Sequence, residues 1–279
     1  MHKTIQDITN MKKEKKKISV ITSYDYTLAS LCDKAGIDIL LVGDSAGMVM
    51  LGYENTIPVT MDQMCIFTEA VSKARKDSLL VADLPFMSYQ ASIEDAIRNS
   101  GRLVKSGADA VKLEGGSIMA ETISAIVDVG IPVMGHIGLQ PQTTMLSEGY
   151  KVQGKTKDTA MKLIEDAKEL EDAGVFSIVL EMVSHEVAQI ISETVTIPVI
   201  GIGSGVNCDG QVLVVQDLLG MYDKIKPKFV KRYMNLTEDV VKSLKDYKKD
   251  VESGAFPTKE NSFSMNEEEL KKLREQIGS

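Results

Sequence analysis

Acidic side chains stand at the ends of several apolar stretches of this chain, where they could bind a cation or move a proton. Asp44 closes the run IDILLVGD, Asp83 lies near the end of LLVADLPF, and Glu114 lies near the end of ADAVKLEGG, with Lys112 two residues before it. Glu181 lies near the end of VFSIVLEMV in the same way. Carboxylate oxygens are preferred ligands of hard divalent cations, and a carboxylate can also serve as a general acid or base. Metal binding and proton transfer are therefore the chemistry that these spacings indicate.

The elements that must position these side chains are short apolar runs separated by amphipathic segments. Continuous apolar runs, rather than strict alternation, are typical of strands in a parallel sheet that is covered on both faces. The segments between them have helix signals: Ser92 and Ser117 are predicted N-caps, and residues 158–173 place apolar residues on one stripe. The predicted strands are 17–25, 37–44, 79–86, 108–116, 131–138, 175–183, 197–205 and, more weakly, 210–217.

Strand and helix alternate about eight times, which predicts an α/β fold of the closed (β/α)₈ TIM-barrel type. We expect the chain, residues 1–279, to be a single domain with a barrel core at about 18–235 and a helical tail at about 236–279. Residues 265–276 are predicted as a terminal helix capped by Asn266, packed outside the barrel or against another subunit. An open doubly wound sheet is the alternative, but the GxGxxG fingerprint that such sheets usually carry after the first strand is missing.

Active sites of such barrels lie at the C-terminal ends of the strands. Because side chains alternate along a strand, Lys112 and Glu114 share one face with Ala110, and we expect that face to point into the barrel mouth. Val111 and Leu113 would then face the helices.

The same alternation pairs Asp83 with Val81, and Asp44 with Val42, and predicts that both carboxylates also reach the mouth. Unpaired buried carboxylates are costly, and a hard divalent cation with oxygen ligands removes the repulsion between them. Room for water favours Mg²⁺ over zinc. The alternative, that each acid is a separate helix cap or surface residue, is weaker for three consecutive strand ends.

Other residues leave their interpretation open. His136 ends the fifth predicted strand and is as compatible with a structural role as with a catalytic one. Glu181 is equally compatible with a general base and with a cap. The loop GIGSG, at 201–205, follows the seventh predicted strand and could hold a phosphate or form a tight turn.

Composition excludes several classes of protein. The net charge of −8 argues against nucleic acid as a partner, and the basic run at 11–17 is short and contains a glutamate. No apolar run reaches the length of a membrane span, and the N-terminus lacks the apolar core of a signal peptide. The three cysteines form no CxxC or zinc pattern. We therefore expect a cytoplasmic protein without a membrane partner.

The sequence resembles the ketopantoate hydroxymethyltransferase family over most of residues 18–235. The matching stretches, in chain order, are TSYDYTLA (22–29), LVGDSAGMVMLGYENTIPVT (41–60), VADLPFMSY (81–89), AVKLEGG (110–116), VMGHIGLQPQ (133–142), GYKVQGKT (149–156), IVLEMV (178–183), IPVIGIGSG (197–205), DGQVLVVQDLLG (209–220) and KPKFVKRY (226–233). Three positions depart from the residues common in the family: Ala46 replaces leucine, Gln140 threonine and Ser204 alanine. None of these changes removes a functional group.

The resemblance implies a barrel of the phosphoenolpyruvate/pyruvate superfamily that assembles into a large homo-oligomer, typically a decamer. It also implies transfer of a one-carbon unit from 5,10-methylenetetrahydrofolate to 3-methyl-2-oxobutanoate through an enolate stabilised by Mg²⁺. The product is 2-dehydropantoate, on the route to pantothenate and coenzyme A.

Site roles carried over by motif follow from the same resemblance. The Mg²⁺-associated carboxylates, acting directly or through water, would be Asp44, Asp83 and Glu114. Substrate contacts would come from Ser45 and Lys112 together with Asp44 and Asp83, the general base would be Glu181, and His136 would be an active-site neighbour.

Two alternatives of different kinds remain at this level. One is another Mg²⁺-dependent lyase or mutase of the same barrel superfamily that acts on a different 2-oxo acid. The other is a barrel that serves only as a non-catalytic oligomeric scaffold. A scaffold has no need for five polar residues at the ends of its strands, which argues against the second.

Overall fold

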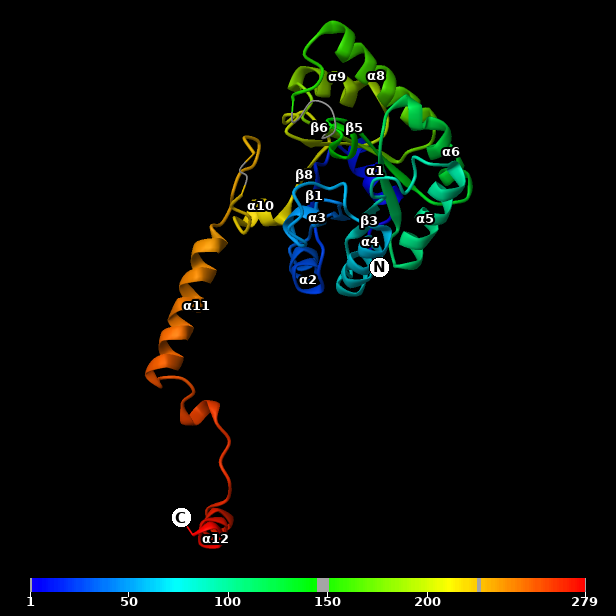
Figure 1. Cartoon of the computed structure of the whole chain (residues 1–279). Coiled ribbons are helices and arrows are strands. Elements are labelled where there is room, and N and C mark those ends of the chain that lie inside the picture. Colours follow the sequence, from blue (N-terminus) through cyan, green and yellow to red (C-terminus); the bar gives the residue numbers. More distant parts are fainter. Residues whose placement is uncertain (1, 145–150, 225–226, 279) are drawn as a thin grey trace.

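Eight parallel strands form a closed barrel in the compact part of the protein (Figure 1). The computed structural model describes residues 2–144, 151–224 and 227–278. Each strand pairs with its sequence neighbours, and β8 returns to pair with β1, so the prediction of a closed barrel is confirmed and the open sheet is wrong. The strands are β1 (Ile18–Thr22), β2 (Ile39–Val42), β3 (Leu79–Asp83), β4 (Ala110–Glu114), β5 (Val133–Gly138), β6 (Ser177–Glu181), β7 (Val199–Ile202) and β8 (Gly210–Leu213).

Helices pack around the outside of the barrel, for example α4 against α2 and α5, and α8 against α9. They and the shorter turns are α1 (Ile5–Lys13), α2 (Tyr26–Lys34), α3 (Ala46–Val49), α4 (Met61–Ala74), α5 (Ile93–Lys105), η1 (Ser117–Met119), α6 (Ala120–Asp128), α7 (Pro141–Thr144), α8 (Lys157–Asp172), α9 (His185–Thr194), α10 (Val215–Leu219), α11 (Leu236–Ser253), η2 (Lys259–Asn261) and α12 (Glu267–Ile277). The last predicted strand, 210–217, was too long, because its final residues form the first turn of α10.

The predicted helix starts are correct in two cases and wrong in one. The side chain of Ser92 accepts a hydrogen bond from the amide of Asp95, and that of Asn266 from the amide of Glu268. Ser117 caps nothing; it begins the short turn η1, and α6 starts only at Ala120. The reason lies in α8, where the carboxylate of Asp166 accepts the backbone N–H of Ser117 at 2.8 Å and holds this loop in its own conformation.

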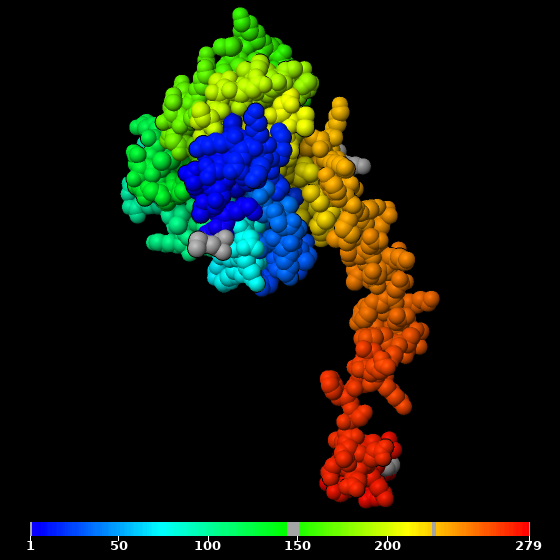
Figure 2. Space-filling model, turned by 180° about the vertical axis from the view of Figure 1, so that it is seen from behind, coloured from blue at the N-terminus to red at the C-terminus, as the bar shows by residue number. Residues whose placement is uncertain are grey.

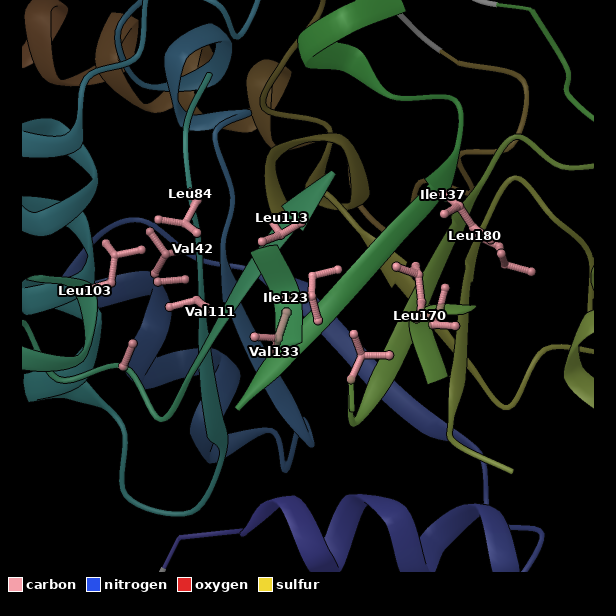
Figure 3. Packing of buried hydrophobic residues seen from close by; sticks show 14 of the residues in the cluster. Val42, Leu84, Leu103, Val111, Leu113, Ile123, Val133, Ile137, Leu170 and Leu180 are labelled. Atoms are coloured by element: carbon pink, nitrogen blue, oxygen red, sulfur yellow. The ribbon is translucent and has the colours of Figure 1, made fainter. Parts of the chain in front are cut away.

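Two apolar layers follow from the alternation along the strands. One lies between strands and helices, and Figure 3 shows part of it, with Leu103 of α5 beside strand residues such as Val111. The other fills the inside of the barrel and includes Ala110 and Val81. Val111 therefore faces the helices while Ala110 faces inward, which confirms the predicted parity of β4.

The parity predicted for β2 is wrong. Val42 packs in the outer layer, so a side chain two residues later on the same strand would also face outward. However, β2 ends at Val42, and Asp44 lies in the turn that leads into α3. The turn, rather than strand alternation, carries Asp44 to the barrel mouth.

The N-terminal helix α1 lies across the other end of the barrel, and appears in dark blue in Figure 2. Ile8 of this helix is fully buried in the inner apolar layer. The Nζ of Lys12 donates to the carbonyls of Ser192 and Ile197, at 2.9 and 2.8 Å, and lies 2.9 Å from a carboxylate oxygen of Asp209. Part of the basic run at 11–17 thus fixes α1 to the barrel, which leaves the C-terminal ends of the strands as the open end.

The chain leaves the barrel after α10 and extends away from it as α11, η2 and α12 (Figures 1 and 2). This confirms the extra C-terminal helices. Neither α11 nor α12 buries a residue, although α11 exposes Leu244 and Tyr247 and α12 exposes Ile277. The extension therefore does not pack on its own barrel in the described structure. No helix among the described residues is long and apolar enough to cross a membrane.

Candidate active site

The ends of the strands line a cavity of about 390 Å³ at the open end of the barrel. All seven side chains that the sequence placed here border this cavity, namely Asp44, Ser45, Asp83, Lys112, Glu114, His136 and Glu181. Five come directly from β3, β4, β5 and β6, and the other two from the turn after β2. His136 lies two residues before the end of β5, because that strand continues to Gly138.

Lys112 is paired with Asp83. The two residues are register partners on neighbouring strands, and the Nζ of Lys112 lies 2.5 Å from Oδ1 of Asp83, with both side chains almost fully buried. Burial lowers the pKa of Lys112, but the carboxylates of Asp83, Glu114 and Asp44 outweigh it and raise the pKa above its ordinary value. Lys112 is therefore a cation deep in the cavity.

Asp44 lies among other acids. Its backbone N–H donates to Oδ2 of Asp83 at 3.3 Å, and its carboxylate accepts a hydrogen bond from Nε2 of Gln142 at 2.9 Å. Burial, together with the charges of Asp83 and Glu114, raises the pKa of Asp44 to about 8. Burial also raises the pKa of Asp83, against the opposing effect of Lys112. Burial and repulsion from neighbouring acids thus favour the protonated forms of these two acids.

His136 lies between two glutamates. Its Nδ1 is 3.5 Å from Oε1 of Glu114, and its Nε2 is 3.4 Å from Oε2 of Glu181. Both ring nitrogens are buried, and neither has a hydrogen bond of normal geometry to any of the described residues. Burial and the charge of Lys112 lower the pKa of His136, but the two glutamates outweigh them and raise it to about 9. The two glutamates therefore favour the protonated form of the imidazole.

Two residues that the sequence did not single out hold the carboxylates in place. The backbone N–H of Gln142 donates to Oε2 of Glu114 at 3.0 Å, while its side chain donates to Asp44. The hydroxyl of Tyr89 lies 2.9 Å from Oε1 of Gln142 and accepts the backbone N–H of Glu114 at 3.1 Å. Gln142 and Tyr89 are far in sequence from the residues they contact, so no local sequence pattern predicts these contacts.

Ser45 is held by a further residue that the sequence reasoning missed. Its Oγ lies 2.8 Å from the hydroxyl of Tyr24, which is 1% exposed. Burial raises the pKa of Tyr24, and that hydroxyl remains protonated at neutral pH. The preceding Gly43 leaves room for this arrangement, because a Cβ there would lie 3.0 Å from the Oγ of Ser45.

The backbone is strained directly after Glu181. Met182 has a φ of +49°, which is uncommon for a residue with a side chain and is often found at functional sites. Its N–H donates to the carbonyl of Ile202 at 2.8 Å, and its carbonyl accepts the N–H of Gln153 at 2.7 Å. These two bonds hold the bend that ends β6 at the cavity.

The loop GIGSG behaves as a packed turn. The hydroxyl of Ser204 donates to the carbonyl of Leu180 at 2.8 Å and accepts the N–H of Val183 at 3.1 Å. Ser204 is 1% exposed, so this hydroxyl is committed to the protein. These contacts favour the turn interpretation of 201–205 over a phosphate cradle.

The donor set fits a hard divalent cation. Asp44, Asp83 and Glu114 bring buried carboxylate oxygens to one cavity. Burial and then repulsion from the other two acids raise the pKa of Asp44, and a cation would relieve the repulsion. In the described parts of the chain, however, no three His, Cys, Asp or Glu side chains already form a ready-made metal site. A cation here would therefore complete its coordination with substrate and water, as Mg²⁺ usually does.

A closed barrel with buried acids and a buried lysine at its C-terminal end defines an enzyme of the (β/α)₈ class. The family model of ketopantoate hydroxymethyltransferase matches residues 2–259, and the chain belongs to this family. It is 86% identical to the 3-methyl-2-oxobutanoate hydroxymethyltransferase of Nitrosopumilus maritimus (strain SCM1), over 100% of both chains. It is 59% identical to the protein of the same name from Cenarchaeum symbiosum (strain A), over 91% of this chain and 96% of that one.

Solved structures show the same fold at low identity. Phosphonopyruvate hydrolase in complex with oxalate and Mg²⁺ has a TM-score of 0.61 at 10% identity, over 100% of this chain and 95% of that one. 2,3-Dimethylmalate lyase, a member of the PEP mutase/isocitrate lyase superfamily, has a TM-score of 0.59 at 14% identity, over 100% and 98%. The family to which the chain belongs is therefore one of hydroxymethyltransferases of pantothenate synthesis, built on this barrel. The interpretation as a non-catalytic scaffold is wrong. Of the matching stretches, residues 149–150 and Lys226 lie outside the described residues.

Proposed function

We propose that this enzyme transfers a hydroxymethyl group from 5,10-methylenetetrahydrofolate to 3-methyl-2-oxobutanoate and forms 2-dehydropantoate. Within this family, the observation that carries the proposal is a buried lysine among three buried carboxylates in one cavity. Such a set can hold a small 2-oxo acid through its anionic group and, with a cation, through its keto oxygen.

Mg²⁺ is the proposed metal, held by Asp44, Asp83 and Glu114 directly or through water. When bound, it would polarise the keto group and stabilise the negative charge that develops when C3 loses its proton. The structural neighbour that was crystallised with oxalate and Mg²⁺ supports this choice, because oxalate is also a small acid with adjacent oxygen donors.

Lys112 and Ser45 would bind the substrate carboxylate. Lys112 is a permanent cation in the cavity, and Ser45 is held by Tyr24. A charged group and an oriented hydroxyl fix the acid in one pose and keep its C3 at a constant position. If Lys112 pairs with the substrate carboxylate, Asp83 would be free to hold the metal.

Glu181 would remove the C3 proton. It lines the cavity, its side chain is 15% exposed, and Nε2 of His136 lies 3.4 Å from its Oε2. The carboxylate thus lies close to the substrate space, which a general base requires.

The carbon–carbon bond then forms between C3 of the enolate and the methylene carbon of the carrier. The two bonds from that carbon to the carrier nitrogens break, and water supplies its hydroxyl group. The nitrogens take up the proton removed from C3 and one proton of the water, which releases tetrahydrofolate. No oxidant or reductant is needed, since the one-carbon unit keeps its oxidation level.

We also propose that the enzyme is a cytoplasmic homo-oligomer, with the decamer of the family as the expected form. The exposed apolar residues of α11 and α12 support assembly, because side chains such as Leu244 and Ile277 have no cover on their own barrel. The three cysteines are free, as expected in a reducing compartment.

The test is exchange of the C3 proton, followed by NMR of 3-methyl-2-oxobutanoate in D₂O. Exchange with enzyme and Mg²⁺ that stops with EDTA would establish enolisation of this substrate. Addition of methylenetetrahydrofolate should then yield 2-dehydropantoate. Absence of both exchange and product, with folded enzyme and Mg²⁺ present, would contradict the proposal.

A further inference from the structure

The cavity has a second half that the 2-oxo acid does not use. Beyond the charged residues its walls are largely apolar and include Met182, Ile202, Leu213, Tyr222 and Phe229. A volume of about 390 Å³ lies within the range in which proteins bind drug-sized ligands. A five-carbon acid at the charged end leaves this apolar half free for a second, larger molecule.

One carboxylate faces this apolar half. Asp217 of α10 lines the cavity and is half-buried, and among the described residues no donor makes a hydrogen bond to its side chain. Burial raises its pKa, and the nearby charge of Arg232 opposes the rise. A partly desolvated carboxylate without a donor is unfavourable unless a ligand supplies one.

Asp217 also shares its cavity with the proposed substrate contacts. Asp44 and Ser45 line the same cavity as Asp217, and the hydroxyl of Tyr24 holds Ser45. The apolar half is therefore continuous with the place proposed for the 2-oxo acid.

The aromatic ring of Phe229 also borders this half of the cavity. The ring of Phe229 packs against the backbone of Gly203, where a Cβ would lie 3.0 Å from Cδ1 of the ring. Gly203 has a φ of +66°, so both its conformation and this contact call for glycine. The same Cβ would lie 3.5 Å from Cγ of Met182, which directly follows Glu181. Phe229 and Met182 thus both lie beside Gly203, and Met182 is next in the chain to the proposed base Glu181.

The segment that carries Phe229 is tied to α10. The N–H of Met221 donates to the carbonyl of Gln216 at 2.8 Å, and that of Tyr233 to the carbonyl of Leu218 at 2.9 Å. The guanidinium of Arg232 donates to the carbonyl of Tyr222 at 3.0 Å. The described parts of 221–233 are therefore positioned by backbone contacts near Asp217.

We propose that this half of the cavity binds the reduced pterin ring of the one-carbon carrier, with Asp217 accepting two of its N–H groups and Phe229 packing on its face. The inference rests on the proposed function and extends it to the second substrate. A pterin presents a ring N–H and an amino group side by side, which match the two oxygens of one carboxylate. Its flat body suits an aromatic and thioether wall.

The test is binding of tetrahydrofolate, measured anaerobically by titration calorimetry in the presence of Mg²⁺. Asp217→Asn replaces one acceptor oxygen with a donor, and we expect its Kd for tetrahydrofolate to rise at least about tenfold. Phe229→Leu keeps an apolar side chain but loses the flat ring, and its Kd should rise about threefold to tenfold. Asp223→Asn is the matched control, because it removes the same charge from an exposed residue of the same segment.

Binding of 3-methyl-2-oxobutanoate should stay within about twofold of wild type in all three variants. A wild-type Kd for tetrahydrofolate in Asp217→Asn overturns the pterin site, as does an equal loss of both ligands, which would indicate structural damage. The proposed function has its own outcome. If the wild type forms 2-dehydropantoate and Asp217→Asn has an unchanged KM for the carrier, only the pterin site fails. If the wild type forms no product and binds no tetrahydrofolate, both fail.

Discussion

The Nζ of Lys112 and Oδ1 of Asp83 form a buried ion pair across neighbouring strands, 2.5 Å apart. Lys112 stands two residues from Glu114, but its partner is on β3. Breaking a buried pair is costly unless both charges gain new partners. A substrate carboxylate for Lys112 and a cation for Asp83 would supply them together, so the pair can couple binding of the acid to binding of the metal.

Lys112→Met tests this coupling. The substitution removes a positive charge next to Asp83, so we expect Mg²⁺ to bind more tightly in the absence of substrate. The 2-oxo acid loses a charged partner, and its Kd should rise about tenfold to a hundredfold. Titration calorimetry measures both constants. Weaker Mg²⁺ binding in a folded variant would show that Lys112 does not compete with the metal for Asp83.

Glu114→Gln tests the metal assignment. We expect the Mg²⁺ concentration for half-maximal activity to rise at least about tenfold, since a charged ligand becomes neutral. The melting temperature should change little, because an amide oxygen can still accept the N–H of Gln142. Glu121→Gln, at an exposed position of α6, is the control. An unaltered Mg²⁺ requirement in Glu114→Gln would remove this residue from the metal site.

Glu181→Gln tests the proposed base. Exchange of the C3 proton in D₂O should slow by about 10²–10⁴-fold, the usual contribution of a general base. The Kd of the 2-oxo acid should remain nearly constant, because the proposed substrate contacts come from other elements of the barrel. Glu186→Gln, nearby and exposed, should exchange at the wild-type rate. Glu181 is not the base if its variant still exchanges the proton normally.

Much of the site could be predicted from the sequence because it follows from strand parity. Lys112 and Glu114 point where β4 alternation puts them, and the apolar runs are the strands of a barrel. Asp44 reaches the mouth for another reason, since β2 ends before it and a turn takes over. Strand alternation predicts side-chain direction only within the strand and not in the turn that follows it.

Contacts between distant parts of the chain could not be predicted. Gln142 binds Asp44 across 98 residues of sequence, and Tyr89 contacts Glu114 across 25. Local spacing predicted Ser117 as a cap, because it gives no information on Asp166, which lies in another helix and accepts the N–H of Ser117. In each case a tertiary partner decided the outcome, and a single sequence gives no register between such partners.

Gln142→Leu tests the role of that long-range partner. It removes the donor to Asp44 and the group beside Tyr89 but keeps a side chain of similar size. Because Gln142 positions proposed metal ligands, Gln142→Leu should lower Mg²⁺ affinity and kcat by about 10–100-fold, the range typical of residues that orient metal ligands. Gln142→Glu can keep the contact with Tyr89 but not the donor to Asp44, so it should not rescue Mg²⁺ affinity. If neither variant loses Mg²⁺ affinity, Gln142 does not position the metal ligands.

Asp33 links stability to pH at a distance from the active site. Its carboxylate accepts the backbone N–H groups of Lys76, Asp77 and Ser78, at 3.0, 3.0 and 2.9 Å, and the hydroxyl of Ser78 at 2.8 Å. Burial alone would raise its pKa, but these donors outweigh burial and hold the pKa below the ordinary value of 3.8. The charged form is thus favoured by the folded state. Its contribution is complete above pH 3.8 and is lost as the pH falls through the lower folded pKa.

Asp33→Asn should therefore lower the free energy of unfolding at pH 7 by about 2 kcal/mol, because charge-assisted hydrogen bonds become weaker neutral ones. The difference from wild type should shrink as the pH falls below 3.8, where the native carboxylate also loses its charge. Urea unfolding at a series of pH values measures it. Asp77→Asn, exposed and adjacent to the same loop, controls for the loss of a surface charge. A constant difference between Asp33→Asn and wild type at every pH would contradict the linkage. Only a group whose pKa differs between the folded and unfolded states makes the free energy of unfolding depend on pH.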